Sequence, residues 1–239
     1  MRSGFPGFPA EALTFLRSLA RNNRREWFQE RKEIFETRVK GPMIELVNAL
    51  NAELVKFAPD YATDPQHAIY RIYRDTRFST DKTPYKDHIA AIFSRHGLEK
   101  HTAASFYFSI SPKEIEMAGG LYRPGPEQLL AVRTHLAEHH LEFRRIARAK
   151  KLRELVGELW GDQLSRVPKG FSPHHPAADL IRYKQWLVYT MLDTDLAVTP
   201  YLFPELVKRF RAVTPLVEFL NRPLAGKRKR RDEDYLREW

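Results

Sequence analysis

Residues 69–95 read IYRIYRDTRFSTDKTPYKDHIAAIFSR, and this stretch decides the expected fold. Its opening segment, Ile69–Arg74, combines isoleucine and tyrosine, which favour strands, with arginine. His88–Arg95 is a second strand candidate, and the polar residues between them, with Pro84, indicate a loop. The sequence therefore predicts a basic strand–loop–strand unit at the centre of the protein.

Further strands are expected after this unit. Ala104–Ile110 alternates aromatic and aliphatic side chains with serine and tyrosine, and Glu114–Met117 forms a short run that Gly119-Gly120 would end. Short connections between these segments favour an antiparallel meander. Residues 184–192 fit a fifth strand or a helix almost equally well.

Helical patterns occupy both sides of the expected sheet. Near the start, Leu13, Leu16 and Leu19 recur at helical spacing, and Asn22-Asn23 indicates a stop followed by a new N-cap. Further helices are expected at residues 27–35, 43–57, 129–136 and 203–220, with a kink or an end at Gly41-Pro42, and a basic helical stretch is expected at Leu141–Val156. The predicted fold is α+β: a single domain over residues 1–224, with the meander packed against N-terminal and C-terminal helices. Residues 225–239 are expected to form a charged, flexible tail.

The composition excludes several classes of protein. None of the 239 residues is a cysteine, which rules out disulfides, thiolate zinc sites, iron–sulfur clusters and a cysteine nucleophile. No apolar run approaches the roughly 18 residues that span a bilayer, and residues 1–10 lack the apolar core of a signal peptide. We therefore expect a cytoplasmic protein with no membrane partner. The formal net charge of +10 favours acidic partners, or else reflects only a solvated basic surface.

The segment from residue 71 to residue 86 concentrates positive charge. It carries five basic and two acidic residues, a surplus of three, namely Arg71, Arg74, Arg77, Lys82 and Lys86 against Asp75 and Asp81. Arginine side chains match the geometry of phosphate and carboxylate groups, so this segment predicts an anion site.

Individual roles in the predicted site follow from the chemistry of each side chain. Arg71 and Arg74 would clamp the anion, with Arg77 beside them, and Lys82 and Lys86 would add point charges. Tyr85 would supply a directed hydroxyl. Supporting positions are expected at Asp75, Asp81, Ser79 and His88, with further hydroxyls from Thr80 and Thr83. The ligand would be a phosphate-containing small molecule; whether the site is also catalytic, and through which residues, is left open.

Two other interpretations of the basic residues stay open beside this one. In the first, carboxylates neutralise the arginines and the segment is a structural salt-bridge network or a module that binds a protein partner. In the second, the protein binds nucleic acid through a broad basic surface. That surface would combine the loop with Arg24-Arg25 and the helical stripe of Arg144, Arg148 and Lys151, and the tail from Lys227 to Arg231 could add to it.

The remaining motifs predict neither a metal nor a cofactor. His139-His140 and His174-His175 are adjacent pairs, which do not face one another on a helix or a strand. The chain also lacks a phosphate-cradling glycine-rich loop and the Gly-x-Ser-x-Gly elbow of serine hydrolases. The oligomeric state is not indicated by any of these patterns.

One extended motif resembles a known family. The run Arg-Asp-x-Arg-Phe-Ser-x-Asp-Lys-x-Pro-Tyr-Lys, at Arg74–Lys86, is similar to that of an uncharacterised family of bacterial and fungal proteins, domain of unknown function 2461. Three further segments share the resemblance, which extends to about Leu224: Asn22-Asn23 with Trp27-Phe28, Phe106–Gly120, and Pro168–Phe171 with His175-Pro176. The resemblance implies one compact α+β domain and implies no activity.

Overall fold

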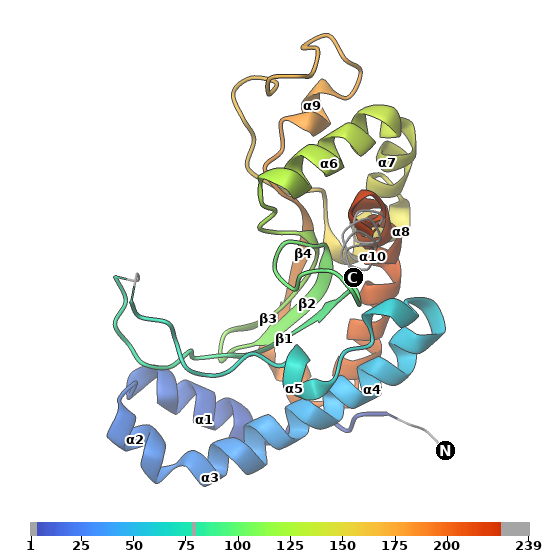
Figure 1. Ribbon diagram of the computed structural model, residues 1–239. Helices are drawn as coiled ribbons and strands as arrows, with labels where there is room; N and C mark the ends of the chain where they lie inside the picture. The colour runs from blue at the N-terminus through green and yellow to red at the C-terminus, as the bar shows by residue number, and fades with distance from the viewer. Residues whose placement is uncertain (1–3, 78–79, 226–239) are drawn as a thin grey trace, which may run out of the picture. The chain divides into compact units, whose positions relative to one another are not determined.

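The computed structural model describes residues 4–77 and 80–225 (Figure 1). Its contacts divide the chain into two compact units. The first unit draws on Met1–Phe93, Tyr107–Met117 and Thr190–Arg209, and the second on Ser94–Phe106, Ala118–Tyr189 and Phe210–Trp239. The predicted tail lies outside the described residues from position 226 onward.

A four-stranded antiparallel sheet confirms the predicted α+β class and its meander. Strands β1 (Ile89–Ser94), β2 (Ser105–Ile110), β3 (Glu114–Leu121) and β4 (Trp186–Asp193) pair in the order β1-β2-β3-β4, as Figure 1 shows. Residues 184–192, which fitted a strand or a helix, thus contribute the last strand. Each strand passes from one unit into the other, so that both units contain part of the sheet.

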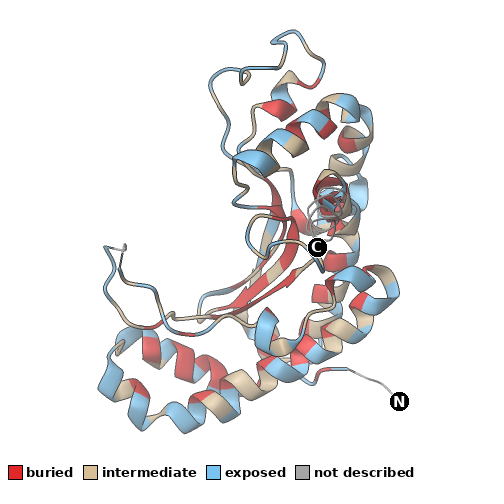
Figure 2. Cartoon of the chain, in the orientation of Figure 1, coloured by how far each residue is buried: buried red, intermediate tan, exposed pale blue. Residues whose placement is uncertain are grey.

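Helices of the first unit follow the predicted apolar spacing. They are α1 (Ala10–Arg21), α2 (Arg25–Glu30), α3 (Lys32–Ile34), α4 (Gly41–Phe57) and α5 (Pro65–Ala68), with short 3-10 turns at Pro59–Tyr61 and Thr194–Val198. Leu13, Leu16 and Leu19 are buried on one face of α1, and Figure 2 shows this helix with both buried and exposed positions. The chain does not end its helix at Gly41-Pro42: a π-helical segment, Phe35–Lys40, leads directly into α4.

Helices of the second unit are α6 (Pro126–Glu138), α7 (His140–Ala147), α8 (Lys150–Val156) and α9 (Ala178–Ile181), joined by most of α10 (Leu202–Ala225). Buried Asn221 on α10 ties this helix to the start of β2, because its side chain both donates to and accepts from the backbone of Ala104, each at 2.8 Å. Among the described residues, no helix combines the length and the apolar character needed to cross a membrane.

The glycines expected to end a strand lie inside β3 instead. A Cβ at Gly119 would lie 2.3 Å from Cγ1 of Val213 on α10, and a Cβ at Gly120 would lie 2.1 Å from the carbonyl oxygen of Trp186 on β4. Gly120 also has a φ of +127°. The prediction that β3 stops before these residues was wrong, because the glycines let a helix and a neighbouring strand approach the sheet closely.

The predicted strand Ile69–Arg74 was also wrong, since this segment makes only isolated bridges, Ile69 with Ala91 and Tyr73 with Tyr85. Ile69 and Tyr73 are four positions apart, whereas their bridge partners Tyr85 and Ala91 are six positions apart. The segment from Tyr85 to Ala91 therefore has two more residues than the segment it faces. This change of register breaks the ladder and prevents a regular strand. Two backbone hydrogen bonds still join residues 69–74 to residues 85–91. Tyr70 N–H donates to the carbonyl oxygen of Ala90, and Lys86 N–H donates to that of Ile72.

Candidate functional site

Asn23 anchors the end of the basic loop in the first unit. Its side-chain Nδ2 donates to the carbonyl oxygen of Tyr85 at 2.9 Å, and its Oδ1 accepts from the N–H of Tyr85 at 3.0 Å. The expected role of Asn23 as a helix N-cap was wrong, since the N-cap of α2 is Arg24. The asparagine amide instead satisfies both backbone groups of a residue that has no regular strand partner.

The Tyr85 ring is fixed by aromatic packing. It is 1 % exposed and stacks on Phe28 of α2, with ring centroids 4.2 Å apart and an interplanar angle of 19°. Tyr73 lies at 5.4 Å from the same ring. Burial raises the pKa of the Tyr85 hydroxyl, so at neutral pH this group is a protonated hydrogen-bond donor.

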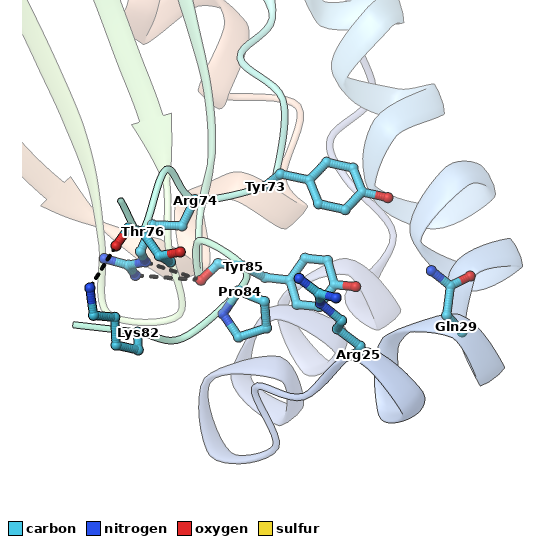
Figure 3. Close-up of a pocket in the computed structure, with 8 residues that line it drawn as sticks. All are labelled: Arg25, Gln29, Tyr73, Arg74, Thr76, Lys82, Pro84 and Tyr85. Carbon is cyan, nitrogen blue, oxygen red and sulfur yellow. Dashed lines mark hydrogen bonds between the residues drawn. The ribbon is translucent and has the colours of Figure 1, made fainter. Parts of the chain in front are cut away.

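A pocket of about 420 Å³ opens beside this aromatic cluster (Figure 3). Its volume falls within the range of roughly 300–1,000 Å³ typical of small-molecule sites. The residues that line it are Arg25, Gln29, Tyr73, Arg74, Thr76, Lys82, Pro84 and Tyr85. Arg74, Lys82 and Tyr85 were predicted as site residues from the sequence, whereas Arg71, Arg77 and Lys86 do not line this pocket.

The pocket has a loop side and a helix side. In Figure 3 the Arg74 and Lys82 side chains come from the basic loop, and Arg25 and Gln29 come from α2. Sequence reasoning missed Gln29 as a site residue and weighed Arg25 only as part of a broad basic surface. The available signal was the helical spacing itself, because positions 25 and 29 are one turn apart and share a face of α2.

Two of the predicted arginines already have carboxylate partners. Arg74 NH1 lies 3.0 Å from Asp81 Oδ2, and Arg77 donates through Nε and NH2 to Asp75 at 3.0 and 2.8 Å. The hydrogen bonds from Arg77 lower the pKa of Asp75 to about 2. Hydrogen bonds from Thr83 lower the pKa of Asp81, with a smaller contribution from Arg74. These pairs support the structural interpretation for that part of the loop.

The other cations form no direct ion pair within the described part of the chain, although Arg71 contributes to lowering the pKa of Asp75. Within residues 4–77 and 80–225, no carboxylate forms an ion pair with Arg25, Arg71 or Lys86. Lys82 Nζ, likewise without a carboxylate there, donates to the carbonyl oxygen of Thr76 at 2.8 Å. Burial, and then the positive charges of Arg71 and Arg74, lower the pKa of Lys86, whose Nζ lies 5.0 Å from the centre of the Tyr70 ring. The region therefore has spare positive potential.

The predicted supporting residues are not gathered in the pocket. His88 Nδ1 lies 3.2 Å from Asp87 Oδ1 and does not line the pocket. Thr83 donates its hydroxyl to Asp81 at 2.8 Å, and Thr80 is exposed. Ser79 lies outside the described residues.

The features proposed for nucleic acid belong to different units. Arg24, Arg25 and the loop lie in the first unit, and the stripe of Arg144, Arg148 and Lys151 lies in the second. Arg144 is already engaged by Asp179, at 3.0 and 2.6 Å, and by the carbonyl oxygen of Pro176 at 2.8 Å. This pairing weakens the stripe as a phosphate-binding surface. The basic run Lys227–Arg231 lies outside the described residues.

Comparison with known proteins identifies a family over most of the chain. The family model described as "Conserved hypothetical protein (DUF2461)" matches residues 11–219. No curated protein and no solved structure gives a match. The matched range includes every residue that lines the pocket.

Proposed function

This chain belongs to the DUF2461 family of conserved hypothetical proteins, and from that premise we propose that its first unit binds a small phosphate-containing ligand in the pocket between α2 and the basic loop. The family description carries no activity, so the proposal depends on the residues of the pocket. The observation that carries it is the presence of two cations without a carboxylate partner in the described structure, Arg25 and Lys82, on a cavity of about 420 Å³.

Charge is the main argument for a phosphate group. Arg25 offers the planar, multiple-donor guanidinium that pairs with phosphate oxygens, and Lys82 adds an ammonium point charge. Arg74 also lines the pocket, but it shares its charge with Asp81 and donates to the Tyr85 carbonyl oxygen, so its main role is to position the loop. An anion would offset the repulsion among these cations.

The neutral part of the pocket suits an organic portion of the ligand. Tyr73, which is 47 % exposed, presents aromatic surface to the pocket, and rings of this kind pack against sugars and bases; the Tyr85 ring lines the pocket but is almost fully buried. Gln29 adds an amide that both donates and accepts hydrogen bonds. We therefore favour a sugar phosphate or a nucleotide over inorganic phosphate alone.

The test is calorimetric titration of the full-length protein with inorganic phosphate, sugar phosphates, mononucleotides and short oligonucleotides, each at two salt concentrations. Arg25→Gln and Lys82→Met are the test variants, and Arg24→Gln is the matched control, because Arg24 is an exposed neighbour that does not line the pocket. A charge-assisted hydrogen bond contributes about 1.5–3 kcal/mol. Each test variant should therefore weaken binding by roughly 10- to 150-fold, with Arg24→Gln unchanged.

Other outcomes favour the competing interpretations. Binding of oligonucleotides alone, with affinity falling steeply as salt rises, would favour nucleic-acid association. If no phosphorylated compound binds and Arg74→Ala only lowers the melting temperature, the loop is a structural salt-bridge network and the proposal fails.

A further inference from the structure

We propose that α6 carries a binding site for one divalent transition-metal ion, formed by His135, Glu138 and His139 in the second unit. The ligand atoms of these three side chains all lie within 4.8 Å of one another. The site is independent of the phosphate pocket, which belongs to the first unit.

The C-terminal end of α6 brings the three side chains together. His135 and Glu138 stand at i and i+3 on the last turn of the helix, and His139 follows as its C-cap residue, with its ring 4.5 Å from that of His135. Two histidines four positions apart, as in the sequence His135-Leu-Ala-Glu138-His139, recur in helical zinc sites, where the glutamate between them serves as a general base and not as a ligand. The motif therefore supports the two histidines, and the proximity of Glu138 supports its inclusion here. The prediction of no metal overlooked this spacing, because it considered His139 beside His140 and not together with His135 and Glu138.

His135 provides the second, independent observation. Its side chain is 92 % buried, yet its Nε2 atom has no hydrogen-bond partner among the described residues. Leaving a buried polar nitrogen unsatisfied costs about 1–3 kcal/mol, so such an atom calls for a ligand. Its ring is held in place between neighbouring rings, at 4.6 Å from Phe219 and 4.5 Å from His139.

The spacing of the side chains is compatible with coordination of one ion. His139 Nε2 already lies 3.9 Å from Glu138 Oε2. Tetrahedral coordination with bonds of about 2.0–2.1 Å needs ligand atoms about 3.3 Å apart. Rotation of the exposed Glu138 and His139 side chains would give that spacing.

The surrounding charges are compatible with a cation. Arg222 is the nearby positive group, and Glu142 neutralises it through two hydrogen bonds of 2.9 and 3.0 Å. Glu138 then supplies a net negative charge at the site. Two imidazoles and one carboxylate are borderline ligands that favour Zn²⁺, Co²⁺ or Ni²⁺ over Mg²⁺ and Ca²⁺. Three protein ligands would leave one coordination position for water or a small molecule.

The test is titration of the untagged, full-length protein with Co²⁺ and Zn²⁺, followed by the visible absorption of bound Co²⁺ and by calorimetry. We expect one tightly bound ion with the spectrum of nitrogen and oxygen coordination. His139→Asn and Glu138→Gln should each weaken binding at least tenfold. His174→Asn is the matched control, because it removes an exposed histidine away from the cluster and should leave the affinity unchanged.

Because His139 and Glu138 are exposed, these variants should fold, which circular dichroism can verify. His135→Asn could unfold the second unit and is therefore not used as the deciding variant. Equal affinity in wild type and His139→Asn, or no binding of Co²⁺ or Zn²⁺ at micromolar concentration, would overturn the proposal. Arg25→Gln should leave metal affinity unchanged, which separates this site from the phosphate pocket.

Discussion

At the scale of single residues, one amide replaces a pair of backbone hydrogen bonds. Tyr85 lies where the register of the chain changes, and the Asn23 side chain satisfies both its N–H and its carbonyl oxygen. The sequence predicted Asn23 as a helix cap and included it in a segment that resembles the family, but neither observation indicated this contact. The real function of Asn23 depends on a contact across 62 positions of the chain, which local patterns cannot reveal.

Asn23→Ala is expected to destabilise the first unit. The substitution leaves the Tyr85 N–H without its side-chain partner and leaves the Tyr85 carbonyl oxygen with only the two 3.4 Å bonds from Arg74, at a cost of about 1–3 kcal/mol. Differential scanning calorimetry should show a melting temperature lower by several degrees. Asn48→Ala, at an exposed position on α4, is the control and should change it little. An unchanged melting temperature in Asn23→Ala would mean that water satisfies Tyr85 equally well.

Asp75 gives a prediction for pH. Hydrogen bonds from Arg77 lower the pKa of Asp75 from 3.8 to about 2. Between these two pH values Asp75 is mostly ionised in the folded protein and mostly protonated in the unfolded chain. The contribution of ionised Asp75 to the stability of the folded protein is therefore present above about pH 4 and is lost as the pH falls through 2. An NMR titration of the side-chain carboxyl should follow this pKa. In Arg77→Gln the pKa should return part of the way toward 3.8, because the backbone N–H of residue 77 still donates to Asp75; a value near 2 in that variant would exclude the Arg77 side chain as the main cause.

At the scale of elements, the sequence predicted strands that depend on their own residues, and it failed where a boundary depends on packing against another element. The strands β1 and β2 were predicted from their own residues because β-branched and aromatic side chains fill both segments. The continuation of β3 through Gly119-Gly120 was not predicted. Glycine in a strand indicates either an end or a close approach, and only the position of α10 distinguishes the two.

Gly119→Ala should therefore destabilise the second unit through a single contact. Its Cβ would lie 2.3 Å from Cγ1 of Val213, and overpacking of this kind costs about 1–3 kcal/mol. Val213→Ala alone leaves a cavity, but the double variant should recover part of the loss because the two changes relieve one another. Urea denaturation of the four proteins measures the coupling. Strictly additive losses would show that Val213 moves aside without cost.

At the scale of the whole molecule, the α+β class and the antiparallel meander followed from the sequence, but the place of β4 in the sheet did not, and the sites followed only in part. The loop cations were visible as a surplus of charge, and Arg74, Lys82 and Tyr85 do line the pocket. Which of the loop arginines pair with carboxylates depends on side-chain positions that composition does not encode. The contribution of α2 required knowledge that two segments far apart in the chain lie side by side.

The path of the chain through the two units has a practical consequence for dissecting the protein. Each unit gathers three separate stretches of sequence, and all four strands are shared between them. No single cut can release either one intact, so a fragment carrying the pocket would have to splice residues 107–117 and 190–209 onto the N-terminal part through artificial linkers. Gene truncation is therefore an unsuitable route to separating the two proposed activities, and point substitutions within the intact polypeptide are the appropriate tool.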